Sequence, residues 1–124
     1  MASHQDLKVW QLAQHVAAQV HRATRGRASN EVPAVVDQIR RSSQSVSANI
    51  AEGRALGSSA QFKRHLSIAL GSAAETDSHM AALLALDLVE PDEALRILDD
   101  LAAIQRMLVS LQRAIMHGSK PRPR

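Results

Sequence analysis

The sequence contains no cysteine and almost no aromatic residues; its 124 residues include one Phe, one Trp and no Tyr. Without cysteine there is no disulfide framework and no thiolate metal site, a usage that suits the reducing cytoplasm. The scarcity of aromatic side chains disfavours the base stacking by which most proteins hold single-stranded nucleic acid. The sequence also lacks an apolar run of about 18 residues and a signal-peptide pattern at its start. We therefore expect a cytoplasmic protein that does not span a membrane.

The residues that are present favour helices around an aliphatic core. Hydrophobic residues make up 45% of the chain, and Ala and Leu are strong helix formers. The apolar spacing predicts helices over about 4–24, 33–53, 59–88 and from 91 onward, with Pro33 and Pro91 in first turns, Gly53 as a stop and Ser58 or Ser59 as an N-cap. We predict an all-α fold, an antiparallel up-and-down four-helix bundle over residues 1–117, followed by a disordered basic tail over residues 118–124.

Charge is distributed unevenly along the chain, although the formal net charge is only +3. Residues 22–64 hold eight Lys or Arg and three Asp or Glu, a balance of +5, whereas residues 65–117 hold three and eight, a balance of −5. Such asymmetry allows either a basic surface for nucleic acid or a contact between identical subunits. The candidate nucleic-acid-binding residues are five cations of the basic block: Arg40, Arg41, Arg54, Lys63 and Arg64. Their contacts would go to phosphates, with little sequence selectivity and a steep dependence on salt.

Small residues lie opposite the apolar stripe on both middle helices. Ser45 and Ala48 occupy such positions on the predicted 33–53 helix. Gly71 lies in the middle of the next helix, where Gly costs about 1 kcal/mol relative to Ala. Its presence there indicates either a close helix crossing or a tolerated defect. Close packing by a second subunit would explain these residues, and a solvated face would explain Ser45 and Ala48 equally well. We keep both interpretations.

One carboxylate falls within an apolar stripe. Asp77 shares the stripe of the predicted 59–88 helix. A buried unpaired carboxylate is costly, so we expect Asp77 to pair with a cation, to lie near an edge, or to be protonated. Arg40 and Arg41 are the candidate partners.

Several segments resemble a known protein family. They run from Asp6 to Trp10, from Gln38 to Arg41, from Asn49 to Gly53 and from Phe62 to Glu75. In this order they resemble the four-helix-bundle proteins encoded by intervening sequences of 23S ribosomal RNA genes. That family also includes the accessory variability proteins of diversity-generating retroelements. The chain departs from the family pattern at His65, where an aromatic residue is usual.

The resemblance implies an up-and-down bundle that assembles as a homopentameric ring or barrel. In the retroelement branch it also implies binding of nucleic acid, RNA or DNA, and of a reverse transcriptase. Arg40, Arg41, Asn49, Glu52 and Glu75 are positions of the family motif. The resemblance implies structural roles for them. Asn49 and Glu52 would lie near a helix end, and the carboxylates would form ion pairs with the arginines.

No residue pattern indicates catalysis. The six histidines include no pair four residues apart, so we expect no metal site. No glycine-rich phosphate loop occurs, and we expect no cofactor and no enzyme activity. A small hydrolase that uses Glu52, Glu75 and Asp77 as acid and base is the least favoured class. The leading hypothesis is a homo-oligomeric adaptor that binds nucleic acid or a nucleic-acid enzyme. The alternative is a purely structural assembly protein whose arginines only bridge subunits.

Overall fold

The computed structural model describes residues 4–116, and every regular element in that part of the chain is helical. A short 3-10 turn, η1, covers His4–Asp6. The helices are α1 (Lys8–Ala23), α2 (Arg27–Glu31), α3 (Pro33–Ala55), α4 (Ser59–Ala85) and α5 (Pro91–Met116). The predicted all-α fold is confirmed. The predicted tail, residues 118–124, lies outside the described residues.

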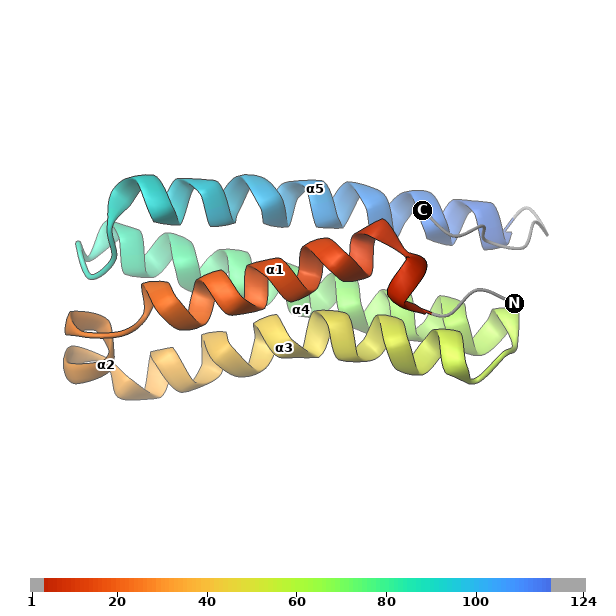
Figure 1. Ribbon diagram of the computed structural model, residues 1–124, viewed down its shortest axis with the longest axis horizontal. Coiled ribbons are helices and arrows are strands. Elements are labelled where there is room, and N and C mark those ends of the chain that lie inside the picture. Colours follow the sequence, from red (N-terminus) through yellow and green to blue (C-terminus); the bar gives the residue numbers. More distant parts are fainter. Residues whose placement is uncertain (1–3, 117–124) are drawn as a thin grey trace.

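The four long helices lie side by side along the molecule (Figure 1). α3 packs against α4, α4 against α5, and α1 against both α3 and α5. In Figure 1, α1 leads through α2 into α3 at one end, α3 turns into α4 at the opposite end, and α4 turns into α5 at the first end. Each long helix therefore buries one face against two others and turns another face outward.

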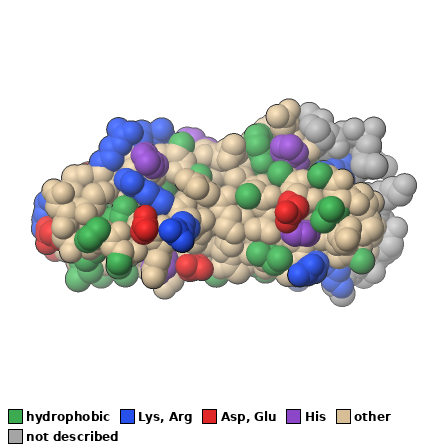
Figure 2. All heavy atoms as spheres, turned by 90° about the horizontal axis from the view of Figure 1, so that it is seen from below, with side chains coloured by type: hydrophobic (Ala, Val, Ile, Leu, Met, Phe, Trp, Pro, Cys, Tyr) green, Lys and Arg blue, Asp and Glu red, His purple; other side chains and the backbone are tan. Residues whose placement is uncertain are grey.

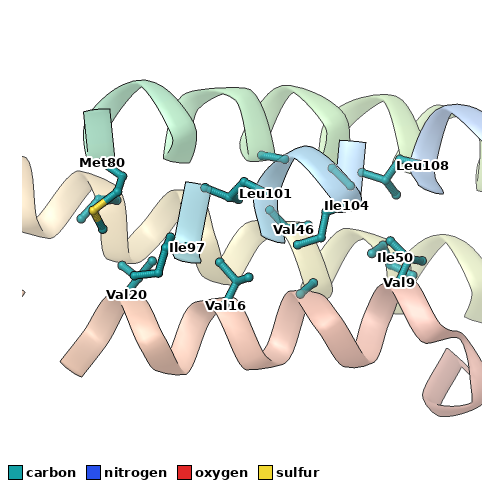
Figure 3. Packing of buried hydrophobic residues seen from close by; sticks show 14 of the residues in the cluster. Val9, Val16, Val20, Val46, Ile50, Met80, Ile97, Leu101, Ile104 and Leu108 are labelled. Atoms are coloured by element: carbon teal, nitrogen blue, oxygen red, sulfur yellow. The ribbon is translucent and has the colours of Figure 1, made fainter. Parts of the chain in front are cut away.

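The core is mostly aliphatic, as the composition predicts, although the buried Phe62 also belongs to it. Val16, Ile50, Met80 and Leu101 are examples from the four long helices, and each is at most 2% exposed. Figure 3 shows these side chains pointing from the four helices into the same space. Burial of this apolar surface is the main source of stability for such a fold.

Local signals set most helix ends. Pro33 and Pro91 are the first residues of α3 and α5, as predicted. The Ser58 side chain accepts a hydrogen bond from the Gln61 N–H at 3.1 Å and so caps α4. The predicted extension of this helix to Leu88 is wrong, because α4 ends at Ala85.

The end of α4 has a specific geometry. Asp87 adopts a positive φ of 57°. The Leu88 N–H donates to the Leu83 carbonyl at 3.0 Å, and the Asp87 N–H donates to the Leu84 carbonyl at 3.0 Å. These two bonds form a Schellman motif, in which Asp87 takes the position that glycine usually occupies.

Two further predictions are corrected. The predicted break between the first two helices contains α2, a five-residue helix that buries Ala28. Gly53 does not stop α3, which continues to Ala55, and the positive φ of the following turn is taken by Gly57. Among the described helices, none is long and apolar enough to cross a membrane.

Candidate functional site

A row of polar side chains joins α3 to α4 within the chain. The Ser42 and Thr76 hydroxyls lie 2.8 Å apart, and the Ser72 hydroxyl donates to the Ser45 hydroxyl at 2.9 Å. Thr76 also donates to the Ser72 carbonyl at 2.8 Å. Ser42 and Thr76 are buried although both are polar. The row therefore satisfies buried hydroxyls between two helices, as a packed interior requires.

The row ends in a cluster of polar groups around His65, near the turn between α3 and α4. The Asn49 amide donates to the Ser45 carbonyl at 2.9 Å and to the Ser45 hydroxyl at 3.0 Å. Its oxygen lies 3.0 Å from His65 Nδ1. Glu52 Oε2 lies 3.3 Å from the same nitrogen. Because both neighbours of Nδ1 are acceptors, this nitrogen carries the hydrogen and donates.

α3 and α4 approach each other closely at Gly53. A Cβ placed there would lie 2.7 Å from His65 Cβ and 3.2 Å from Phe62 Cδ1. At Gly71 a Cβ would meet nothing within 4 Å in the chain. The helix crossing that the sequence suggested for Gly71 is therefore made inside the chain by Gly53. Gly71 and Ala48 both face outward. The outward position predicted for Ser45 is wrong, because its hydroxyl is half-buried and bonds Ser72 of α4.

Two of the candidate cations lie near the junction of α1, α2 and α3. The Arg40 guanidinium donates to the Thr24 hydroxyl at 3.0 Å and to the His21 carbonyl at 3.3 Å, so it holds the end of α1. Arg41 lies 3.8 Å from Asp37, and both side chains are exposed. Arg40 therefore has a structural task, whereas Arg41 projects into solvent.

The other three candidate cations lie toward the opposite end of α3. The Arg54 guanidinium lies over the Phe62 ring, 5.7 Å from its centre. Lys63 and Arg64 are exposed in the first turns of α4. Arg41 and Arg54 are thirteen residues apart on one helix, or about 20 Å along its axis. The five candidate cations thus form two groups, and their role toward nucleic acid stays a prediction.

The first group is larger than the sequence reasoning proposed. Arg22, Arg25 and Arg27 are exposed at the end of α1 and the start of α2, next to the residues that Arg40 binds. Figure 2 shows Lys and Arg side chains gathered toward the end of the molecule that contains α2. A smaller group lies toward the other end, with few charges in between. The segment Arg25-Gly26-Arg27 could have signalled this group.

The three carboxylates of the hydrolase alternative lie apart. Glu52 is beside His65, and Glu75 lies 3.5 Å from His79 within α4. Ten residues separate His65 from Glu75, or about 15 Å of helix. In the described part of the chain, no group of three His, Cys, Asp or Glu could hold a metal ion.

Asp77 does not meet its predicted partners. It is partly exposed, seven residues from Leu70, which lines a hollow together with residues of α5. Asp77 therefore lies on the side of α4 that faces α5, whereas Arg40 binds α1 and Arg41 lies beside Asp37. Within residues 4–116, no ion pair involves Asp77. Its position near an edge was one of the predicted alternatives.

Comparison with protein families gives a match to 23S rRNA-intervening sequence protein over residues 5–110. The chain belongs to this family. The match covers α1, α3 and α4 in full and α5 as far as Ser110. A search of curated proteins gave no match.

A solved structure supports the same assignment. It is a crystal structure of a protein of unknown function from the S23 ribosomal protein family of Bacteroides thetaiotaomicron. The two chains are 27% identical, the TM-score is 0.77, and the alignment covers 85% of this chain and 98% of the other. The likeness thus spans most of this chain and nearly all of the other.

Proposed function

We propose that the protein is a non-enzymatic adaptor, an antiparallel up-and-down four-helix bundle that forms a homo-oligomer, a pentamer by family resemblance, and binds the phosphate backbone of a nucleic acid. The binding surface is the arginine corner, defined as Arg22, Arg25, Arg27, Arg40 and Arg41. A nucleic-acid enzyme such as a reverse transcriptase is a further partner that the resemblance implies.

The observation that carries this proposal is the convergence of arginines from three helices. Arg40 reaches from α3 to His21 of α1 and to Thr24, which caps α1, so the basic end of α1 and the start of α2 lie close to Arg40 and Arg41 of α3. Five arginines lie near the carboxylates of Asp37 and Glu31. Arg27 also donates to the Asp87 carbonyl, which brings a third acidic residue close and leaves a local balance of +2. A cluster of this kind attracts phosphates, and Arg suits them because it can donate two parallel hydrogen bonds.

The carboxylates near the corner do not block it. Arg41 and Asp37 side chains are 83% and 74% exposed, and those of Arg27 and Glu31 are 67% and 53% exposed. Exposed pairs of this kind are worth only about 0–1 kcal/mol each. A phosphate can therefore replace either carboxylate at little cost.

Titration of labelled mixed-sequence duplex RNA and duplex DNA at low salt tests the proposal. The informative variant is Arg25→Glu with Arg41→Glu, which spares the structural Arg40. Lys63→Glu with Arg64→Glu is the matched control, because it makes the same charge change near the other end of α3. We expect the first variant to lose most of the affinity and the control to keep it. No binding by the unaltered protein at low salt would refute the proposal.

A purely structural assembly protein is the second candidate, favoured by the outward face of α4. This face carries Ile68, 41% exposed, beside small residues such as Gly71 and Ala74, and Leu86 follows it, 60% exposed. Subunit contact would cover these apolar groups. Light scattering during size exclusion measures the subunit number, for which we expect five. Assembly without any nucleic-acid affinity would favour this second candidate.

A further inference from the structure

The outward face of α5 carries an ordered stripe of residues. α5 forms one long edge of the molecule (Figure 1). Residues spaced alternately by three and four share one side of a helix, opposite the buried side that contains Leu101, Ile104 and Leu108. The outer α5 stripe, read from the N-terminal end, is Asp92, Leu95, Asp99, Ala102, Arg106, Val109 and Arg113.

The two halves of this stripe carry opposite charge. Asp92 and Asp99 flank Leu95 in the first half, and Arg106 and Arg113 flank Val109 in the second. All four charged side chains belong to exposed residues. Within residues 4–116, none of the four takes part in an ion pair.

The stripe is complementary to itself when two copies of α5 lie antiparallel. Asp92 and Asp99 are seven residues apart, about 10.5 Å along the helix, and so are Arg106 and Arg113. An antiparallel copy therefore places Asp92 opposite Arg113 and Asp99 opposite Arg106, and symmetry gives each pair twice. Ala102 and Ala103 fall at the midpoint, where small side chains let two helices approach closely. Arg96, the remaining cation of the first half, lies a quarter-turn or more away from the centre of the stripe.

The same alignment places an exposed leucine over a hollow. Leu95 is 51% exposed. In the antiparallel pairing it lies opposite residues 109 and 110 of the other copy. A hollow opens at those residues between α4 and α5; its lining is Leu70, Gln105, Arg106, Val109, Ser110 and Arg113. Leu95 of each copy would thus fill the hollow of the other, between two guanidinium groups.

We propose that the outer α5 stripe binds a second copy of the chain in a two-fold antiparallel contact. Four observations point to this one occupant. They are the order of the charges, the spacing of the charges, the small side chains at the midpoint, and the match of Leu95 to the hollow. Such a contact is isologous and closes on itself. If the chain forms an oligomer through other surfaces, this contact joins two such oligomers and so doubles the number of subunits. The contact does not depend on nucleic-acid binding.

Charge reversal tests the contact by sedimentation velocity over a range of protein concentrations at low salt. We expect the unaltered protein to show a concentration-dependent doubling of mass that salt weakens, since one helix pair is a small interface. Arg106→Glu with Arg113→Glu makes the stripe acidic throughout, and Asp92→Lys with Asp99→Lys makes it basic throughout. With four charge pairs reversed, each variant should associate with itself at least tenfold more weakly, while an equimolar mixture of the two should associate.

A quadruple variant distinguishes loss of the contact from loss of folding, because it changes all four charged residues and is still expected to associate with itself. Asp92→Arg, Asp99→Arg, Arg106→Glu and Arg113→Glu together invert the stripe and should restore self-association. Leu95→Asp should abolish it without changing the helical circular dichroism. Because the chain has no cysteine, Ala102→Cys gives a single thiol that a short bis-maleimide should link to its copy, whereas Ala18→Cys on α1 should not be linked. No doubling in the unaltered protein, equal association of all charge variants, or equal linking of both cysteine variants would overturn the proposal.

Discussion

Replacement of Gly53 by alanine tests the packing of α3 on α4. In an ordinary solvated helix this change stabilises, because glycine is worse than alanine by about 0.5–1 kcal/mol. At Gly53 the new Cβ would lie 2.7 Å from His65 Cβ, whereas ordinary contacts begin at 3.4 Å. To restore an ordinary contact the two helices would have to separate by the difference, 0.7 Å. His65 Cβ is attached to the backbone of α4, so no rotation of a side chain relieves the contact.

The expected cost follows from two opposing terms. Inserting a methyl group into a packed interior costs about 1–3 kcal/mol. Subtracting the gain in helix propensity leaves a net decrease of about 0–2.5 kcal/mol in the free energy of unfolding, centred near 1 kcal/mol. Separation of the helices also lengthens the 3.0 Å hydrogen bond between Asn49 and His65 Nδ1.

Urea denaturation followed by circular dichroism at one fixed protein concentration measures this decrease. Gly71→Ala is the matched control, because its Cβ meets nothing within 4 Å in the chain. We expect the control to be more stable than the unaltered protein by about 0.5–1 kcal/mol. Stabilisation by Gly53→Ala equal to that of the control would refute the proposed packing. Lower stability in Gly71→Ala would show that an assembly, and not solvent, meets that face of α4.

Three further changes have defined outcomes. Asp87→Gly should raise the free energy of unfolding by about 0.5–1 kcal/mol in thermal denaturation, because glycine has no strain at a positive φ; a decrease would contradict the Schellman motif. Arg40→Ala should cost about 1–3 kcal/mol, since it removes charged hydrogen bonds to α1, and the exposed Arg41→Ala should be near neutral in the same assay. Ser42→Ala and Thr76→Val, alone and combined, should give a coupling of about 1 kcal/mol in a double-mutant cycle, whereas strict additivity would mean that the two hydroxyls do not bond.

The helix boundaries are largely readable from the sequence because their causes are local. Pro33, Pro91 and Ser58 act within one turn, so each can be placed from its neighbours alone. The sequence does not reveal α2, because its five residues are held by distant groups. Ala28 is buried, and the Arg27 guanidinium donates to the Asp87 carbonyl sixty residues away.

The polar row between α3 and α4 cannot be predicted in the same way. Ser42, Thr76 and His65 carry no sequence signal of burial, because polar side chains are usually exposed. They are buried because each finds its partner on the other helix, and no local pattern reveals such a pair. The sequence places Gly53 at a helix end for a related reason, since its meaning depends on His65 opposite it. Among the cations, sequence order does not show that Arg40 binds the end of α1.

The salt dependence of nucleic-acid binding tests the central claim most directly. The claim is that the arginine corner is a phosphate-binding surface. For duplex DNA, the slope of log affinity against log salt concentration becomes shallower by about 0.9 for each phosphate that the protein no longer neutralises. Arg25→Ala with Arg41→Ala should therefore make the slope shallower by close to two such steps, while Lys63→Ala with Arg64→Ala should leave it unchanged. An unaltered protein with no measurable affinity, or a slope that the corner variant leaves unchanged, would contradict the claim.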